Sequence, residues 1–203
     1  MIIIIELIVL LVVIWVGFWQ ASLILAQYIG APSVYASDCA LKKMFDDVSI
    51  KPGDLIIDLG CGNAKSLIIA SKNHQAKGIG VEGSPYCYLI SKIKVLLSGN
   101  SKNIKIIFGS FSCVENQLKK ADFVYIYLSN PSLKKIEPWL FEHIGTKTKV
   151  LSLAFVFPNK KPERTIKVKN LGKETSLRVY TSGMDGERYD RLPRADKPHR
   201  LSQ

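Results

Sequence analysis

The chain has 203 residues, which is enough for one globular domain and a short appendage. Apolar residues make up 47% of the chain, and its formal net charge is +11. All 28 lysines and arginines follow residue 41. No zinc-finger or RNP-type motif accompanies this basic charge, so we expect no nucleic-acid partner. Anionic membrane lipid is the simplest partner for such a charge, and a solvated basic face is the alternative.

The cysteines and histidines predict neither a metal centre nor a thiol catalyst. Cys39, Cys61, Cys87 and Cys113 show no C-x-x-C or metal-ligand spacing. We therefore expect free thiols in a reducing compartment, and no bound metal. The three histidines are scattered along the chain, and no zinc set or Cys–His catalytic set is visible.

The first element is an uncharged apolar segment at residues 7–26, long enough to cross a bilayer core as one helix. We predict a single-pass transmembrane anchor over residues 1–29. A cleaved signal peptide is disfavoured, because no basic residue precedes the segment and its apolar core is too long. A buried core helix is the other alternative, and uniform apolarity around the helix favours lipid. Because basic residues stay on the cytoplasmic side, the rest of the chain should face the cytoplasm.

Residues 30–182 are predicted to form the globular domain, and the polar, highly charged residues 183–203 a flexible basic tail. Pro32 ends the apolar segment, because a proline disfavours helix at the residue before it. Ser37 or Asp38 can cap a helix that runs to Asp47. The apolar side of that helix consists of Ala40, Leu41, Met44 and Phe45.

The most informative stretch is residues 54–64, where an apolar strand breaks into a glycine loop. Gly60 allows a tight turn, and Gly62 lets the backbone approach a ligand. Asp58 places a carboxylate at the carboxyl end of the strand, where open α/β sheets bind ligands. The dinucleotide pattern G-x-G-x-x-G fails, since Lys65 stands where the third glycine belongs. The pattern D-x-G-x-G-x-G fits at Asp58, Gly60 and Gly62, with Ala64 in its last place. Its carboxylate can accept a hydrogen bond from the ammonium group of S-adenosylmethionine. A glycine turn that binds nothing is the alternative.

A second acid, Glu82, ends a short apolar strand over residues 77–82. It follows Asp58 by 24 residues, near the spacing of about 20 expected for a carboxylate that binds ribose hydroxyls. A short helix over residues 66–72 fits between the two acids. Strand, glycine loop, helix, strand and acid therefore form one βαβ unit. A solvated acid at a strand end is the alternative for Glu82.

The remaining chain continues the alternation of helix and strand. Helices are predicted over residues 85–97 and 131–143, and strands over 104–108, 123–128 and 150–157. Such alternation predicts a parallel sheet covered on both faces. Strands over 165–168 and 176–181 have no helix between them, so they form an antiparallel hairpin. We predict an α/β fold of the Rossmann-like, class I methyltransferase type.

Several short runs resemble a known family. They are Gly30-Ala31-Pro32-Ser33-Val34, Lys51-Pro52-Gly53-Asp54, and residues 58–63, 78–82, 121–128 and 150–155. In this order they resemble the membrane-tethered, seven-β-strand S-adenosylmethionine methyltransferases. Mitochondrial members of that family methylate lysines of the ATP synthase c-subunit and the adenine nucleotide translocase. The resemblance covers about residues 1–160, and it implies the fold, the cofactor and the anchor.

The resemblance also implies the cofactor contacts. Asp58 and the backbone of Gly60, Cys61 and Gly62 would hold the methionine end, and Glu82 would bind the ribose hydroxyls. The adenine would be lined by Ser110 and Phe111. Three places depart from the family pattern. The usual Asp-Gly-Arg is Asn63-Ala64-Lys65 here, Tyr35-Ala36-Ser37 stands where a second proline and a Ser or Thr are usual, and Ser110 stands where an aspartate is common.

The methyl acceptor should approach the carboxyl end of the fourth strand, where Tyr127 and Asn130 are the candidates. A packed strand tyrosine and an Asn-Pro turn are the alternative interpretations of these residues. The leading function is methylation of a lysine on a membrane-associated protein. A lipid or quinone-like acceptor is the alternative within the same chemistry, and a non-catalytic nucleotide-binding module is the alternative outside it.

Overall fold

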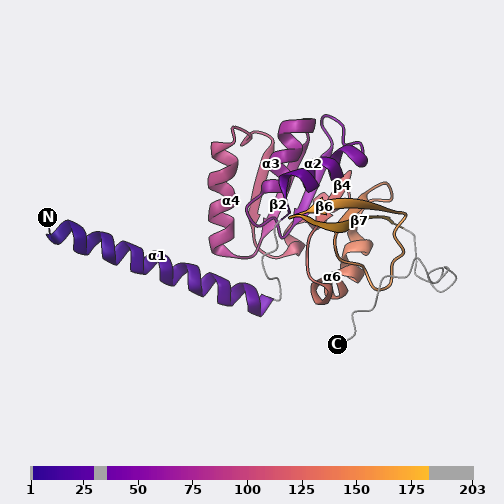
Figure 1. Ribbon diagram of the computed structural model, residues 1–203. Helices are drawn as coiled ribbons and strands as arrows, with labels where there is room; N and C mark the ends of the chain where they lie inside the picture. The colour runs from indigo at the N-terminus through magenta and orange to yellow at the C-terminus, as the bar shows by residue number, and fades with distance from the viewer. Residues whose placement is uncertain (1, 30–35, 183–203) are drawn as a thin grey trace.

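The computed structural model describes residues 2–29 and 36–182, and it shows one long helix projecting from an α/β domain (Figure 1). The projecting helix is α1 (Ile2–Ile29). The domain contains the helices α2 (Asp38–Asp47), α3 (Lys65–His74), α4 (Pro85–Leu97), η1 (Phe111–Val114, a 3-10 helix), α5 (Glu115–Leu118) and α6 (Asn130–His143). Its strands are β1 (Leu55–Leu59), β2 (Lys77–Glu82), β3 (Ile104–Phe108), β4 (Phe123–Ile126), β5 (Lys149–Leu153), β6 (Arg164–Asn170) and β7 (Lys173–Thr181).

The seven strands form one sheet in the order β3-β2-β1-β4-β5-β7-β6. The first five strands are parallel, β7 runs antiparallel to β5, and β6 pairs with β7 as a hairpin. The predicted class I methyltransferase fold is therefore confirmed. The direction in which strands are added reverses between β1 and β4. The chain adds β2 and β3 on one side of β1, and then crosses over to add β4 and β5 on the other side. A ligand crevice is expected outside the carboxyl ends of β1 and β4.

Alternation along the strands builds a core on each face of the sheet. Ile56 of β1 packs with Leu41 of α2 and Leu67 of α3, whereas Ile57 packs with Leu118 of α5 and Leu133 of α6. Successive strand residues point to opposite faces, so Asp58 lies on the same face as Ile56. The carboxylate is thereby directed toward α2 and α3.

Most predicted bounds are confirmed, including those of β2, β3 and α4, and Ser37 is the N-cap of α2. Two strands end earlier than predicted, and the first is β5, which ends at Leu153 instead of residue 157. The cause is Ala154, whose φ of 67° is in the left-handed region and turns the chain out of the sheet. The predicted fourth strand likewise ends two residues early, at Ile126. The predictions for residues 30–35 and 183–203 lie outside the described residues.

Helix α1 is the one described helix that is long and apolar enough to cross a membrane. Residues Ile2–Ala21 have a mean hydropathy of 2.9, and none of this span is buried against the domain. By length and composition the helix is thus a candidate membrane span.

Candidate functional site

The glycine loop after β1 lines a cleft outside the carboxyl ends of β1 and β4, where the ligand crevice is expected. Gly60 and Gly62 have φ values of 84° and 54°, in the region that glycine adopts most easily. The amides of Gly60 and Cys61 donate to the carbonyl oxygen of Val81, at 2.9 and 3.0 Å. These two hydrogen bonds tie the loop to the end of β2, so its shape is fixed before any ligand binds.

Asp58 is the central polar group of the cleft. Its side chain is only 3% exposed, and the Ser66 hydroxyl at the start of α3 donates to one carboxylate oxygen. Burial raises the pKa of Asp58 to about 7; the hydrogen bond from Ser66 opposes this rise, and the charge of Glu82 adds to it. None of the described basic residues forms an ion pair with Asp58. The buried carboxylate therefore favours a cationic ligand.

Glu82 lies beside the loop and is partly pre-ordered. One carboxylate oxygen accepts from the amide of Gly62 at 2.8 Å, and the other accepts from the amide of Ser84 at 2.8 Å. Burial raises the pKa of Glu82, and these backbone hydrogen bonds oppose the shift. Glu82 thus connects the end of β2 to the second glycine of the loop.

Cys61 packs into the sheet and is shielded from reaction. A Cβ added at Gly80 would lie 2.7 Å from the Cys61 sulfur, so the thiol occupies the space that a side chain on β2 would need. Burial, together with the charges of Asp58 and Glu82, raises the pKa of the Cys61 thiol. The thiolate is the reactive form of cysteine, so this residue contributes to the cleft through its backbone and shape.

Tyr125 of β4 is a cleft residue that the sequence interpretation missed. It is the register partner of Asp58 on the neighbouring strand, and both residues line the cleft. Tyr125 is 4% exposed, and its hydroxyl has no hydrogen-bond partner among the described residues. Burial and the nearby Asp58 raise the pKa of Tyr125, so the phenol stays protonated. A buried hydroxyl without a partner is costly, and a polar ligand in the cleft would satisfy it.

Most of the predicted site residues line two cavities, but Glu82 lines neither. The first, of about 40 Å³, is lined by Ala36, Leu41, Asp58, Gly60, Cys61, Gly62, Asn63, Lys65, Ser66, Tyr125 and Tyr127. The second, of about 360 Å³, is lined by Ser110, Phe111, Ser112, Leu128, Ser132, Lys135, Ile136 and Trp139. Leu128, which lines the second cavity, lies 3.1 Å from the position of a Cβ added at Gly60, which lines the first, so the linings of the two cavities are in contact there. Asn130 is exposed at the start of α6 and lines neither cavity.

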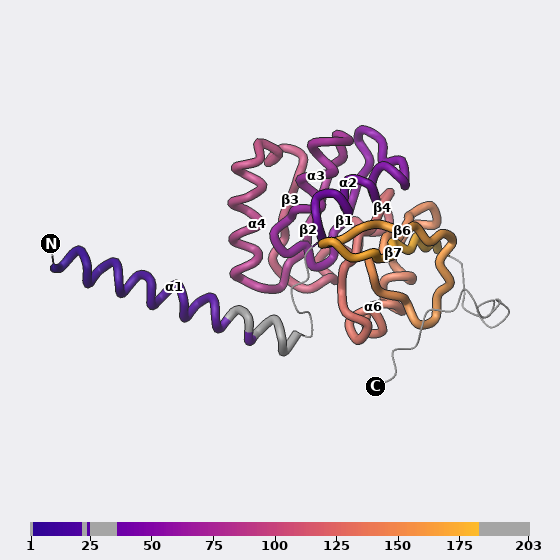
Figure 2. The backbone as a smooth tube through the Cα atoms, viewed as in Figure 1, coloured from indigo at the N-terminus to yellow at the C-terminus, as the bar shows by residue number. Residues whose placement is uncertain are grey.

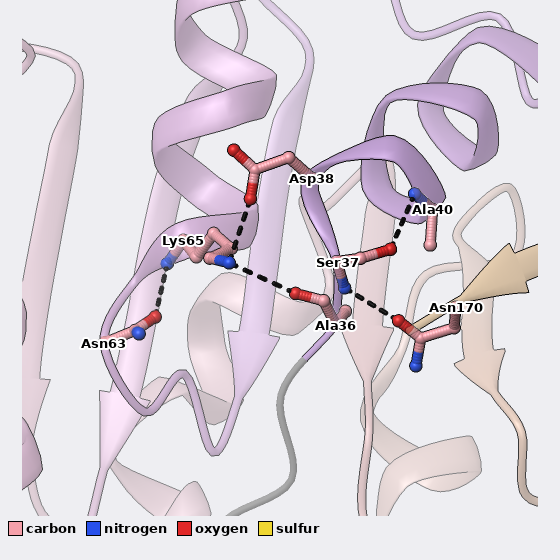
Figure 3. A network of polar contacts seen from close by, with 7 residues as sticks. All are labelled: Ala36, Ser37, Asp38, Ala40, Asn63, Lys65 and Asn170. Atoms are coloured by element: carbon pink, nitrogen blue, oxygen red, sulfur yellow. Dashed lines mark hydrogen bonds and ion pairs between the residues drawn. The ribbon is translucent and has the colours of Figure 1, made fainter. Parts of the chain in front are cut away.

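Beside the first cavity, a polar network connects the residues at the start of α2 to Lys65 and to Asn170 of β6 (Figure 3). Lys65, the first residue of α3, pairs with Asp38 at 2.9 Å and donates to the carbonyl oxygen of Ala36 at 3.4 Å. The amide of Ser37 donates to the Asn170 side-chain oxygen at 2.7 Å. Asn170 in turn donates to the Tyr127 hydroxyl at 3.3 Å.

The start of α2 is therefore held from two sides, by Lys65 after the glycine loop and by Asn170 of the β6–β7 hairpin. Lys65, which departs from the family pattern, acts here as a tether. Asn170 could not be found from the sequence, because its partners lie 43 and 133 residues away.

Comparison with known proteins agrees with this geometry. The model of the ANTKMT methyltransferase domain family matches residues 58–164, more than half of the chain. The chain belongs to this family. This methyltransferase is 24% identical over 153 residues to a protein-lysine N-methyltransferase of Saccharolobus islandicus (strain REY15A), covering 75% of this chain and 94% of the relative.

Two solved structures share the fold. An RNA methyltransferase of Salinibacter ruber in complex with S-adenosyl-L-homocysteine has a TM-score of 0.67 and 22% identity, over 84% of this chain and 100% of the other. The B. subtilis M1A22 tRNA methyltransferase TrmK has a TM-score of 0.62 and 20% identity, over 77% of this chain and 70% of the other. Family and fold together identify an S-adenosylmethionine-dependent methyltransferase.

The residues present fit that cofactor. S-adenosylmethionine carries an ammonium group, which suits the unpaired carboxylate of Asp58, and further polar groups, one of which can satisfy the Tyr125 hydroxyl. No group of three or more histidine, cysteine, aspartate or glutamate side chains is placed to bind a metal within the described parts of the chain.

Proposed function

We propose that this methyltransferase is anchored in a membrane by α1 and methylates a lysine of a membrane-associated protein. The observation that carries the proposal is the cleft around Asp58, a buried carboxylate that pairs with no cation among the described residues, in a chain that also bears an exposed apolar helix. Similarity to a protein-lysine methyltransferase supports a lysine as the acceptor.

The chain divides by role into residues 1–29 as the anchor, 30–182 as the catalytic domain and 183–203 as a basic tail. The apolar length of Ile2–Ala21 matches a bilayer core. Every basic residue follows residue 41. This asymmetry supports a cytoplasmic orientation of the domain.

Each cofactor contact is assigned by chemistry. Asp58 accepts from the ammonium group, and the backbone of Gly60, Cys61 and Gly62 follows the methionine end. Glu82 has two oxygens at the loop for the ribose hydroxyls. The second cavity receives the adenine, with Ser110 as a polar contact and Phe111 as an apolar one. When bound, S-adenosylmethionine supplies a methyl group on a positively charged sulfur, open to in-line attack.

Tyr127 is the candidate contact for the molecule that receives the methyl group. The Tyr127 hydroxyl lines the first cavity and is oriented by the Asn170 amide. Burial raises the pKa of Tyr127, with the Asn170 hydrogen bond opposing the rise, so its oxygen stays protonated and can still accept a hydrogen bond. Accepting from a lysine amine would orient the nitrogen lone pair toward the methyl group. Asn130, exposed at the start of α6, can contact only the outer part of an acceptor.

The proposal is tested by methyl transfer into membranes. Full-length protein is incubated with membranes and S-adenosylmethionine labelled with tritium on the methyl group, and protein and lipid are then separated. We expect label in protein, at lysine after hydrolysis. Label in lipid alone would contradict a protein lysine as the acceptor and would indicate a lipid or quinone-like acceptor. No label in either fraction would contradict catalysis and favour a binding module. Extraction by detergent, and not by high salt, is expected for the anchored chain.

A further inference from the structure

Helix α4 carries an apolar stripe that the fold does not bury. Leu89, Ile93, Leu96 and Leu97 are all exposed, and Leu96 and Leu97 are 68% and 80% exposed. Phe108, at the end of the edge strand β3, is also exposed, and its ring packs beside the helix, 5.4 Å from that of Tyr88 of α4. We call these five exposed residues (Leu89, Ile93, Leu96, Leu97 and Phe108) the α4 face. Outside α1, the one other large apolar side chain exposed in the described residues is Leu171.

The exposure follows from the helical period. Ser91 and Val95 are the buried residues of α4 and point to the sheet. Leu89, Ile93 and Leu96 follow one another at intervals of four and three residues, which places them on one side of a helix. That side is opposite to Ser91 and Val95. The stripe is therefore an ordered helix surface of the domain, and it does not belong to its core.

Charge flanks the stripe on both sides. Lys92 and Lys94 are exposed neighbours of Ile93 in the sequence, so each lies about 100° from it around the helix. The sequence of α4, PYCYLISKIKVLL, has no acidic residue. An apolar stripe bordered by lysines suits the boundary between lipid headgroups and acyl chains, where the lysine stems lie on apolar material and the ammonium groups reach phosphates.

The α4 face is continuous with the proposed anchor. The rings of Phe18 in α1 and Tyr86 in α4 lie 6.4 Å apart. In Figures 1 and 2, α4 stands at the edge of the domain from which α1 projects. A bilayer crossed by α1 would thus run along that side of the domain, with α4 next to its surface.

We propose that the α4 face rests on the lipid surface of the membrane that α1 enters, with Lys92 and Lys94 contacting anionic headgroups. This inference rests on the proposed function in one respect, the anchoring by α1. Helix α4 begins directly after β2, at the edge of the sheet where the cofactor cleft opens. Docking of α4 would hold the cleft at the lipid–water boundary, so the acceptor would be a group at that depth.

Three labelled positions separate the possibilities. Full-length protein carries Cys39→Ser and Cys113→Ser, which remove the two exposed cysteines; this background measures residual labelling. An NBD fluorophore is attached at Leu97→Cys, at Leu171→Cys or at Ile8→Cys. Leu171 is the matched control, because it is a leucine of similar exposure (70%) on the β6–β7 turn. Ile8 reports insertion of α1. The vesicles contain equal amounts of phosphatidylcholine and phosphatidylglycerol.

We expect blue-shifted emission at Ile8→Cys and Leu97→Cys, with quenching of the Leu97→Cys label by nitroxide lipids at headgroup depth, and aqueous emission at Leu171→Cys. An inserted Ile8→Cys label with Leu97→Cys identical to Leu171→Cys would overturn the docking surface and leave the anchor standing. Aqueous emission at all three positions would overturn both. A shift at Leu97→Cys that grows with the protein-to-lipid ratio and resists nitroxide lipids would assign the face to a second copy, and would also overturn the proposal.

The lysines give an independent readout. A lysine near an anionic surface contributes about 1 kcal/mol, so Lys92→Gln or Lys94→Gln should each lower the docked-to-undocked ratio of the Leu97→Cys label about fivefold. The control Lys169→Gln, on β6, should leave the ratio unchanged. Pure phosphatidylcholine vesicles should show little difference among the three. Equal ratios for all three variants in the anionic vesicles would overturn the headgroup contact.

Discussion

Replacing Asp58 with asparagine should weaken cofactor binding and stabilise the cofactor-free protein at the same time. Asparagine keeps the shape of the side chain and an acceptor for Ser66, and it removes the charge. Loss of one partner of a buried, hydrogen-bonded charge pair costs about 2–5 kcal/mol. Asp58→Asn should therefore raise the Kd for S-adenosylmethionine by roughly 30-fold to 5,000-fold.

The stability change has the opposite sign. Folding raises the pKa of Asp58 from 3.8 to about 7. Between these two pH values the folded state binds more protons than the unfolded state, so the free energy of unfolding falls as pH rises through this window. The total loss is on the order of 4 kcal/mol. Asparagine carries no such penalty, so at pH 8 the variant should melt higher, by on the order of 10 °C.

Calorimetric titration and thermal melting of the full-length protein in detergent measure both effects. Wild-type affinity for the cofactor should fall as the pH is lowered below about 7, by about tenfold per pH unit, and the affinity of the variant should be flat there. Asp46→Asn is the control, because this exposed carboxylate lies outside the cleft; it should change neither quantity. Equal cofactor affinity for Asp58→Asn and wild type, or a lower melting temperature of the variant at pH 8, would refute the role of Asp58.

Packing and hydrogen bonding around the cleft give further tests. Gly80→Ala should destabilise by about 1–3 kcal/mol in denaturant unfolding, because its Cβ would lie 2.7 Å from the Cys61 sulfur; Cys61→Ala should recover part of this loss, and strict additivity would contradict the packing. Tyr125→Phe should raise stability by about 1–3 kcal/mol, because it removes a buried hydroxyl without a partner, and should weaken cofactor binding in calorimetry; lower stability would contradict it. Asn170→Ala should destabilise by about 1–3 kcal/mol and lower kcat for methyl transfer, because it frees Tyr127; an unchanged kcat would leave Asn170 a purely structural role.

The element pattern of this chain could be predicted because its signals are local. Ser84 caps α4 and Pro85 opens it, as the Gly-Ser-Pro sequence indicates. The alternation of strand and helix, followed by a hairpin, was sufficient to predict a parallel sheet with an antiparallel hairpin at its end. The turn at Ala154 carries no such signal, since an alanine with positive φ cannot be foreseen from its neighbours. That is why β5 was predicted too long.

The site was predictable where chemistry and spacing coincide in the sequence. Asp58 and Glu82 follow a recognisable order, and the structure places both beside the glycine loop. Tyr125 was missed although it stands two residues before Tyr127 and packs on the same side of the sheet, because nothing local distinguishes a cleft tyrosine from a packed one. The Ser37–Asn170 contact joins the two ends of the domain. Only the folded sheet brings these residues together.

The central claim is that the cleft beside Asp58 binds S-adenosylmethionine. Titration of the full-length wild-type protein with S-adenosylmethionine at pH 8, in an isothermal calorimeter, tests it most directly. Saturable binding of one cofactor molecule per chain is the predicted result. An absence of binding heat up to saturating cofactor, at several temperatures and with a folded protein, would contradict it.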